Sequence, residues 1–165
     1  MGGNYAPTID VSRRAAEQGY QQVLWLYGSD HQITEVGAMN MFFLIRKENS
    51  DAVELITPPL TRGDILPGVT RDSILALARS WPEYEVSERF ITMKDILQAS
   101  KEGRLIEAFG AGTAVIVAPV CAISYMEQEI KIPTGDQPGP LATRLRKTLL
   151  DIQYGRVEHP WSVEL

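Results

Sequence analysis

The sequence has a single cysteine, Cys121, and only two histidines, His31 and His159. One cysteine cannot form a disulfide within the chain, and it cannot supply the thiolates of a four-ligand structural zinc site. Two histidines give little material for a catalytic triad or a histidine-rich metal centre. The scarcity of both residues indicates a reducing compartment and leaves thiol-based and imidazole-based metal chemistry poorly supported.

Positive charge is also scarce, because 16 lysines and arginines face 21 aspartates and glutamates, for a formal net charge of −5. Surfaces that bind nucleic acids or anionic membranes need clustered Lys and Arg, and the longest basic stretch here is residues 144–147. The longest uncharged apolar stretch, residues 108–123, contains glycine, threonine and proline, which favours strands over a membrane-spanning helix. We therefore expect neither a nucleic acid nor a membrane as a partner.

The apolar content is sufficient for one hydrophobic core. At 165 residues, 44% of them hydrophobic, the chain is long enough for a single domain over residues 1–165 and too short for two. Periodicity and turn residues predict a mixed α/β (α+β) fold in which most strands pair antiparallel. The expected helices are residues 9–18, a segment directly after Gly68, residues 92–100 and a segment from Pro140; the expected strands are residues 21–28, 35–47, 52–59, 84–91, a pair within 104–120, and 129–133.

Two helix starts carry capping signals. An apolar face with helical spacing runs from Ile74 to Trp81, and Thr70 is the expected N-cap just before it. Thr92 and Asp95 form a capping-box pattern at the start of the next helix. These signals predict where two helices begin, and helix N-termini are places where proteins bind anions.

Two glycine-containing stretches have the character of anion-binding segments. At Gly68-Val69-Thr70 the first amides of a helix are unpaired, and the helix dipole favours negative charge. In "GAGT", residues 110–113, small residues let the backbone approach a ligand, and Thr113 adds a hydroxyl. Together the two stretches predict a phosphate site, although a glycine turn and a capped helix are each common in proteins without any ligand.

Glu35 is the only acid in "HQITEVGAMNMFF", residues 31–43. A carboxylate buried in such a run is ordinarily paired with an arginine or a backbone amide. Because the chain also offers two anion pockets, a second interpretation is a ligand with a phosphate at one end and a protonated ring nitrogen at the other. Pyridoxal 5'-phosphate is such a molecule, and an acid beside its ring nitrogen would keep the ring protonated and able to accept electrons from a substrate carbanion.

Several strings of the sequence resemble one enzyme family over nearly the whole chain. They resemble, in order and spacing, the large domain of branched-chain aminotransferases of the eukaryotic type, and they are "GGNYAPT", "QQVLWLYGSDHQITEVGAMN", "TPPL", "ILPGVTRDSILALA", "FGAGTA" and "DIQYG". The resemblance implies the D-amino acid aminotransferase-like fold of fold-type IV enzymes, pyridoxal 5'-phosphate as cofactor, and a homodimer of two-domain subunits. It also implies reversible amino transfer from leucine, isoleucine or valine to 2-oxoglutarate, in the cytoplasm or the mitochondrial matrix.

The resemblance assigns contacts with the cofactor to five residues. Glu35 in "TEVG" matches the acid that binds the pyridine nitrogen, and Tyr5 in "GGNY" matches the tyrosine whose hydroxyl contacts the phenolic oxygen. Val69 and Thr70 match the backbone donors to the phosphate, and Thr113 in "GAGTA" matches its side-chain donor. By this resemblance, Glu35 is expected to face a pyridinium.

The resemblance places three further residues near the substrate. Ala114 matches the residue whose backbone amide helps to hold the substrate carboxylate, and Gly112 lies in the same glycine turn. Ala38 stands where the family usually has a threonine near that carboxylate, which implies weaker or altered substrate binding. We expect Ala38→Thr in the full-length enzyme to lower the Michaelis constant for leucine, and an unchanged constant would contradict this role.

The sequence departs from the family at the lysine that forms a Schiff base with the cofactor. In the family this lysine stands just before the "GGNY" segment, so here it would come before Met1, and the small N-terminal domain would precede it. An amine needs a desolvated or cationic setting to become a nucleophile, and polar surface-type segments surround the lysines present: Lys47, Lys94, Lys101, Lys131 and Lys147. We therefore expect a catalytically inactive fragment of a longer enzyme.

Two alternatives remain open. The chain could be a non-catalytic short form that binds the cofactor or pairs with full-length subunits. It could also belong to an enzyme with another fold-type IV activity, such as a D-amino acid aminotransferase or an aminodeoxychorismate lyase, although the long match around Glu35 argues against this.

A further difference from the family concerns Val115 and Ala118, which stand where animal members carry a redox-sensitive Cys-x-x-Cys pair. We expect no such thiol switch, and we expect Cys121 to be a packed small residue.

Overall fold

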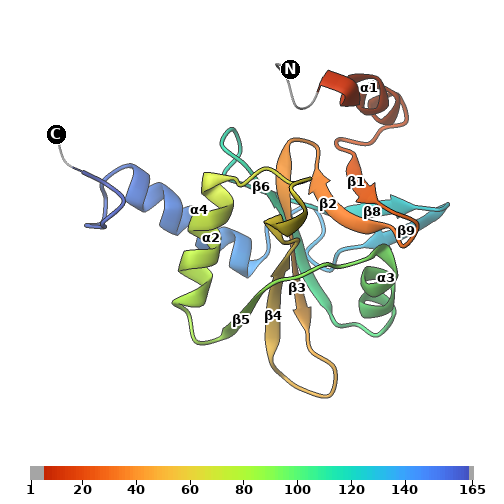
Figure 1. Ribbon diagram of the computed structural model, residues 1–165. Coiled ribbons are helices and arrows are strands. Elements are labelled where there is room, and N and C mark those ends of the chain that lie inside the picture. The colour runs from red at the N-terminus through yellow and green to blue at the C-terminus, as the bar shows by residue number, and fades with distance from the viewer. Residues whose placement is uncertain (1–5, 164–165) are drawn as a thin grey trace.

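The computed structural model describes residues 6–163, so Tyr5 lies outside the described residues. Figure 1 shows a central sheet with α2 and α4 on one side and α3 with a two-stranded sheet on the other. The helices are α1 (Ile9–Glu17), α2 (Val69–Arg79), α3 (Met93–Lys101) and α4 (Pro140–Gln153), with 3-10 turns at Ala6–Thr8 and Leu60–Arg62. The strands are β1 (Leu24–Tyr27), β2 (Gln32–Val36), β3 (Met39–Arg46), β4 (Val53–Thr57), β5 (Tyr84–Glu88), β6 (Leu105–Ala111), β7 (Val117–Pro119), β8 (Ala122–Tyr125) and β9 (Gln128–Lys131).

Strand β3 is the centre of the seven-stranded sheet. It pairs antiparallel with β2 and β4 along one edge and with β6 along the other. The expected mixed α/β class and the expected β3–β4 hairpin are confirmed. One pair departs from the antiparallel pattern, because β5 lies parallel to β4. A parallel pair needs a long crossover connection, and the segment that contains α2 provides it.

The residues of β3 alternate between two hydrophobic cores. Met41 and Phe43 pack into the core formed with α3 and the β8–β9 hairpin, whereas Phe42 and Leu44 pack into the core formed with α2 and α4. Successive side chains of a strand point to opposite faces, so a strand covered on both faces is continuously apolar. Phe42 stacks on its register partner Phe109 of β6, with ring centroids 5.2 Å apart.

The single strand predicted over residues 35–47 is wrong, because this run contains a hairpin. β2 ends at Val36, Gly37 and Ala38 form a two-residue turn, and β3 begins at Met39. Gly37 has a φ of +56°, a left-handed conformation that glycine adopts without strain and that tight hairpin turns require. Glu35 therefore lies near the end of a short strand, next to a turn, rather than at the head of a long one.

Most of the predicted helix boundaries are confirmed. The Thr92 hydroxyl accepts from the Asp95 amide while the Asp95 carboxylate accepts from the Thr92 amide, as a capping box requires. α4 begins at Pro140 as predicted. α2 begins directly after Gly68, but Gly68 itself is the N-cap, and the prediction of Thr70 as the cap is wrong because Thr70 is already the second helical residue.

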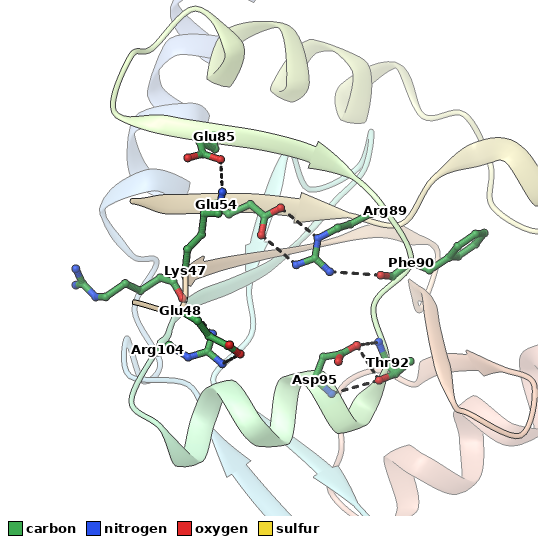
Figure 2. A network of polar contacts seen from close by, with 10 residues as sticks. Lys47, Glu48, Glu54, Glu85, Arg89, Phe90, Thr92, Asp95 and Arg104 are labelled. Carbon is green, nitrogen blue, oxygen red and sulfur yellow. Dashed lines mark hydrogen bonds and ion pairs between the residues drawn. The ribbon is translucent and has the colours of Figure 1, made fainter. Parts of the chain in front are cut away.

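A polar network joins β4 and β5 to the β3–β4 turn (Figure 2). Arg89 donates to both carboxylate oxygens of Glu54, at 3.1 and 3.0 Å, and Lys47 donates to Glu85 at 2.7 Å. Burial alone would raise the pKa of the Glu54 carboxyl, but hydrogen bonds from Arg89 and Ser87 hold that pKa below its ordinary value. The charges of this network are thus matched with one another.

The connections between elements run over the surface. Cys121 lies in the surface connection between β7 and β8 and is exposed, which corrects the expectation that it is packed. Within residues 6–163, every helix is too short or too polar to cross a membrane.

Candidate functional site

The β2–β3 hairpin places two buried polar residues, Glu35 and Asn40, side by side. They are cross-strand partners in the register of the hairpin, and 7% and 5% of their surfaces are exposed. The Asn40 side-chain amide donates a long hydrogen bond, 3.4 Å, to Oε1 of Glu35. A buried polar group without a partner costs about 1–3 kcal/mol, so further polar contacts at this end of the hairpin matter for stability.

Both residues bind the backbone of Leu66, in the loop that leads into α2. The Leu66 amide donates to Oε1 of Glu35 at 3.1 Å, and the Leu66 carbonyl accepts from Nδ2 of Asn40 at 2.9 Å. The Gly68 amide donates to the same carbonyl at 2.9 Å. The loop before α2 is therefore attached to the hairpin through both backbone groups of one residue.

The N-terminal end of α2 is open. Gly68 is the N-cap and has no side chain to cap the helix, and the first amides of an α-helix have no intrahelical acceptor. Within residues 6–163, the amides of Val69 and Thr70 have no protein acceptor either. The Val69 side chain is 82% exposed, so this end of the helix faces solvent. Free amides at the positive end of a helix dipole form a site for an anion.

The glycine turn after β6 lies against the tip of the hairpin. β6 ends at Ala111, which is the register partner of Asn40, so Gly112 emerges beside the start of β3. A Cβ atom on Gly112 would lie 3.1 Å from the Met39 side chain and 3.7 Å from the Ala38 carbonyl oxygen. A larger residue at this position would press on Met39, so glycine permits the close approach of the turn to the hairpin.

The structure gathers most of the predicted site residues around the β2–β3 hairpin. Glu35 is buried within it, and Ala38 is exposed at its turn. Val69 and Thr70 are joined to it through Leu66, as described above. Thr113 and Ala114 belong to a different segment, the one that follows β6. These two exposed residues follow Gly112 and approach the hairpin only through the glycine turn.

Sequence analysis missed three residues that build this site. Asn40 could have been found as the one polar residue besides Glu35 in the otherwise apolar run of residues 35–45. Leu66 acts through its backbone, which no residue type signals. Arg71 in the first turn of α2 is 3% exposed and donates to the Pro58 carbonyl at 3.0 Å and to the Glu88 carboxylate at 2.7 Å. These contacts hold the start of α2 against the ends of β4 and β5.

The fold and the arrangement of the site agree with one class of proteins. The family model described as amino-transferase class IV matches residues 2–123. This is most of the chain, and the chain therefore belongs to the class IV aminotransferase family.

Two similar proteins within this class are branched-chain-amino-acid aminotransferases. The chain is 51% identical over 161 residues to the mitochondrial branched-chain-amino-acid aminotransferase of Mus musculus, and 52% identical over 165 residues to the cytosolic branched-chain-amino-acid aminotransferase of the same organism. These matches cover 98% and 100% of this chain, but only 40% and 42% of the two mouse proteins. The chain thus spans less than half the length of the relatives that it matches.

Solved structures show the same fold. A branched-chain amino acid aminotransferase from Thermobaculum terrenum superposes with a TM-score of 0.73 at 32% identity, over 93% of this chain and 45% of that chain. A fold IV transaminase from Curtobacterium pusillum superposes with a TM-score of 0.68 at 19% identity, over 93% of this chain and 44% of that one. The second likeness shows the fold alone, and both confirm the predicted fold-type IV architecture.

Proposed function

We propose that this chain is the cofactor-binding large domain of a branched-chain aminotransferase that uses pyridoxal 5'-phosphate. The longer protein would transfer the amino group of leucine, isoleucine or valine reversibly to 2-oxoglutarate. Identities of 51% and 52% with proteins of that name support the proposal. Because those two relatives are mitochondrial and cytosolic, we propose the mitochondrial matrix or the cytoplasm as the location.

One structural observation supports the proposal most directly. The buried Glu35 carboxylate accepts a hydrogen bond from the loop that leads into α2, a helix whose N-terminus has no side-chain cap. Glu35 offers negative charge, and the amides of Val69 and Thr70 offer donors at the positive end of α2. A protonated pyridine nitrogen needs a negative partner such as the Glu35 carboxylate, and a phosphate needs donors such as these amides. The residues present therefore fit pyridoxal 5'-phosphate.

Each residue has a distinct task toward the cofactor. The cofactor supplies, when bound, an aromatic ring that accepts electrons from the substrate carbon. The Glu35 carboxylate holds a proton on the ring nitrogen, and neutral donors from Leu66 and Asn40 keep that carboxylate in place. The amides of Val69 and Thr70 and the hydroxyl of Thr113 bind the phosphate, so that the ring keeps one orientation.

The substrate side of the proposal rests on the hairpin tip and the glycine turn. The Ala114 amide, Gly112 and Ala38 would receive the substrate carboxylate, and Tyr5 would donate to the phenolic oxygen of the cofactor. The Ala38 carbonyl lies beside Gly112, which brings these two segments together. With a methyl group at position 38, no side-chain hydroxyl is available there to bind a carboxylate.

No lysine of this chain suits covalent attachment of the cofactor. All five are exposed, as predicted: Lys47, Lys94, Lys101, Lys131 and Lys147. A lysine that forms a Schiff base needs a desolvated or cationic setting, and exposed side chains have neither burial nor a neighbouring cofactor site. We infer that the reactive lysine belongs to a part of the longer protein that this chain does not include, and that the complete enzyme is a homodimer.

The test compares the 165-residue chain with the native polypeptide, identified by its intact mass. We expect the chain to bind pyridoxal 5'-phosphate without transaminating leucine, and a longer native polypeptide to be active on leucine, isoleucine and valine. Leucine transamination by the chain alone would contradict the placement of the lysine. A native mass matching this chain would favour a non-catalytic form that binds cofactor or pairs with longer subunits. Activity restricted to D-amino acids or to aminodeoxychorismate would instead assign another fold-type IV reaction.

A further inference from the structure

Asn40 contacts Glu35, the Leu66 carbonyl and the N-cap of α2, and no sequence motif explains these contacts. Its Nδ2 donates to the Leu66 carbonyl at 2.9 Å and more weakly to Glu35 at 3.4 Å. Because both neighbours of Nδ2 are acceptors, the orientation of the side-chain amide is determined by its surroundings. Only 5% of the residue is exposed, so these contacts are protected from competition by water.

The other end of the Asn40 amide touches the N-cap of α2. A Cβ atom on Gly68 would lie 2.3 Å from Oδ1 of Asn40, closer than any real contact of this kind. The absence of a side chain at Gly68 therefore lets Asn40 pack directly against the first residue of the open helix end. One amide thus contacts the acid, the loop and the helix start together.

We propose that Asn40 is a positioning residue that sets the spacing between Glu35 and the phosphate-binding amides of α2. This inference rests on the proposed function, since the spacing matters only to a ligand that reaches both. Preorganised groups bind a ligand more tightly because less ordering remains to be done when it arrives. A ligand that contacts both Glu35 and the amides of α2 benefits from the correct spacing, whereas a ligand that contacts only the amides does not.

The test uses Asn40→Leu, which keeps the approximate volume but removes both polar ends. Binding of pyridoxal 5'-phosphate, followed by absorbance and calorimetry, should weaken about tenfold, the size of effect typical for groups that orient ligand-binding residues. Binding of inorganic phosphate alone, followed by amide chemical shifts of Val69 and Thr70, should change less than about twofold. A purely structural role would leave both affinities unchanged in the folded fraction.

Two further variants serve as a control for stability and as an independent test of the Asn40 contact. Thr57→Val removes another buried hydrogen bond, from the Thr57 hydroxyl to the Met41 carbonyl at 2.7 Å, and should lower stability without weakening pyridoxal 5'-phosphate binding. Gly68→Ala should displace the Asn40 amide and reproduce the selective loss of pyridoxal 5'-phosphate binding even if Asn40→Leu fails to fold.

The outcomes separate this inference from the proposed function. Selective loss of pyridoxal 5'-phosphate binding in Asn40→Leu or Gly68→Ala would support the positioning role. Unchanged binding in folded variants, or an equal loss of pyridoxal 5'-phosphate and inorganic phosphate, would overturn it while the proposed function stands. Failure of the unsubstituted chain to bind pyridoxal 5'-phosphate would overturn both.

Discussion

The two longest helices, α2 and α4, both begin after a glycine, but they differ in whether the amides of the first turn have a hydrogen-bond acceptor. α2 follows Gly68 and α4 follows Gly139, and neither glycine caps its helix with a side chain. At α4, the amides of Leu141 and Ala142 donate to the Glu107 carboxylate at 3.2 and 2.8 Å. At α2, the amides of Val69 and Thr70 have no acceptor within residues 6–163. One helix start is capped by a carboxyl group of the chain itself, and the other is open to an external anion.

The surroundings of the two helix starts agree with this difference. Glu107 is 1% exposed, and a Cβ on Gly139 would lie 2.3 Å from its carboxyl group, so the glycine lets the acid approach the helix closely. Burial raises the pKa of Glu107, although the amides of Ala142, Leu141 and Gly139 favour its ionised form. A buried carboxyl group that accepts from a helix start in this way stabilises the fold. The exposed start of α2 is the one that a ligand can reach.

Removing the carboxyl group of Glu107 should have the largest effect. Glu107→Leu should lower the free energy of unfolding by about 2–5 kcal/mol, because two buried amides lose their acceptor. Urea denaturation would measure this loss, and binding of pyridoxal 5'-phosphate by the folded fraction should not weaken. A variant of wild-type stability would show that the α4 start does not depend on its carboxylate.

Glu35→Gln should affect the ligand rather than the fold. The glutamine oxygen can still accept from Leu66, but the negative charge opposite the ring nitrogen is gone. We expect binding of pyridoxal 5'-phosphate to weaken about tenfold or more, because a charge-assisted hydrogen bond becomes a neutral one. Inorganic phosphate should bind as before. Equal weakening of both ligands would contradict the placement of Glu35 at the ring nitrogen.

Val69→Asp should make the start of α2 resemble that of α4. A negative charge in the first turn should raise the free energy of unfolding by about 0.3–1 kcal/mol through the helix dipole. The same charge should repel a bound phosphate and weaken its binding. Thermal unfolding and phosphate titration together would test these opposite effects, with the uncharged Val69→Asn as control. Tighter phosphate binding by the aspartate variant would exclude this helix start as the anion site.

The smallest effect concerns the pH dependence of stability. The pKa of Glu107 is raised above its ordinary value of 4.5 in the folded protein, so the folded state binds more protons than the unfolded state between the two pKa values. Stability contributed by this group therefore falls as the pH rises through that window. Relative to Glu107→Gln, the wild type should lose unfolding free energy on going from pH 4 to neutral pH. A parallel pair of profiles would contradict the raised pKa.

Local signals in the sequence predicted elements that depend on local physics. The Thr92–Asp95 capping box and the start of α4 at Pro140 are decided by residues close in the chain, and both are confirmed. The hairpin at Gly37 was missed because apolar residues on both sides of the turn concealed it, since β3 is buried on both faces. Periodicity alone does not reveal a turn within such a run.

The polar contacts at the two helix starts could not be predicted from the sequence, for a different reason. Glu107 caps a helix that begins more than thirty residues later in the chain, and only the sheet register brings the two together. Leu66 contributes its backbone, which any residue carries. The family resemblance could supply Glu35, Val69 and Thr70 as candidate ligands, but the contacts of Asn40 that join them required the structure.

The most direct test is a titration of the 15N-labelled chain with pyridoxal 5'-phosphate, in which the amide signals of the two helix starts are followed together. We predict large shifts at Val69 and Thr70, with no change at Leu141 and Ala142, whose acceptor is already present. Shifts at both helix starts, or at neither, would contradict the claim that α2 is the open anion site of this chain.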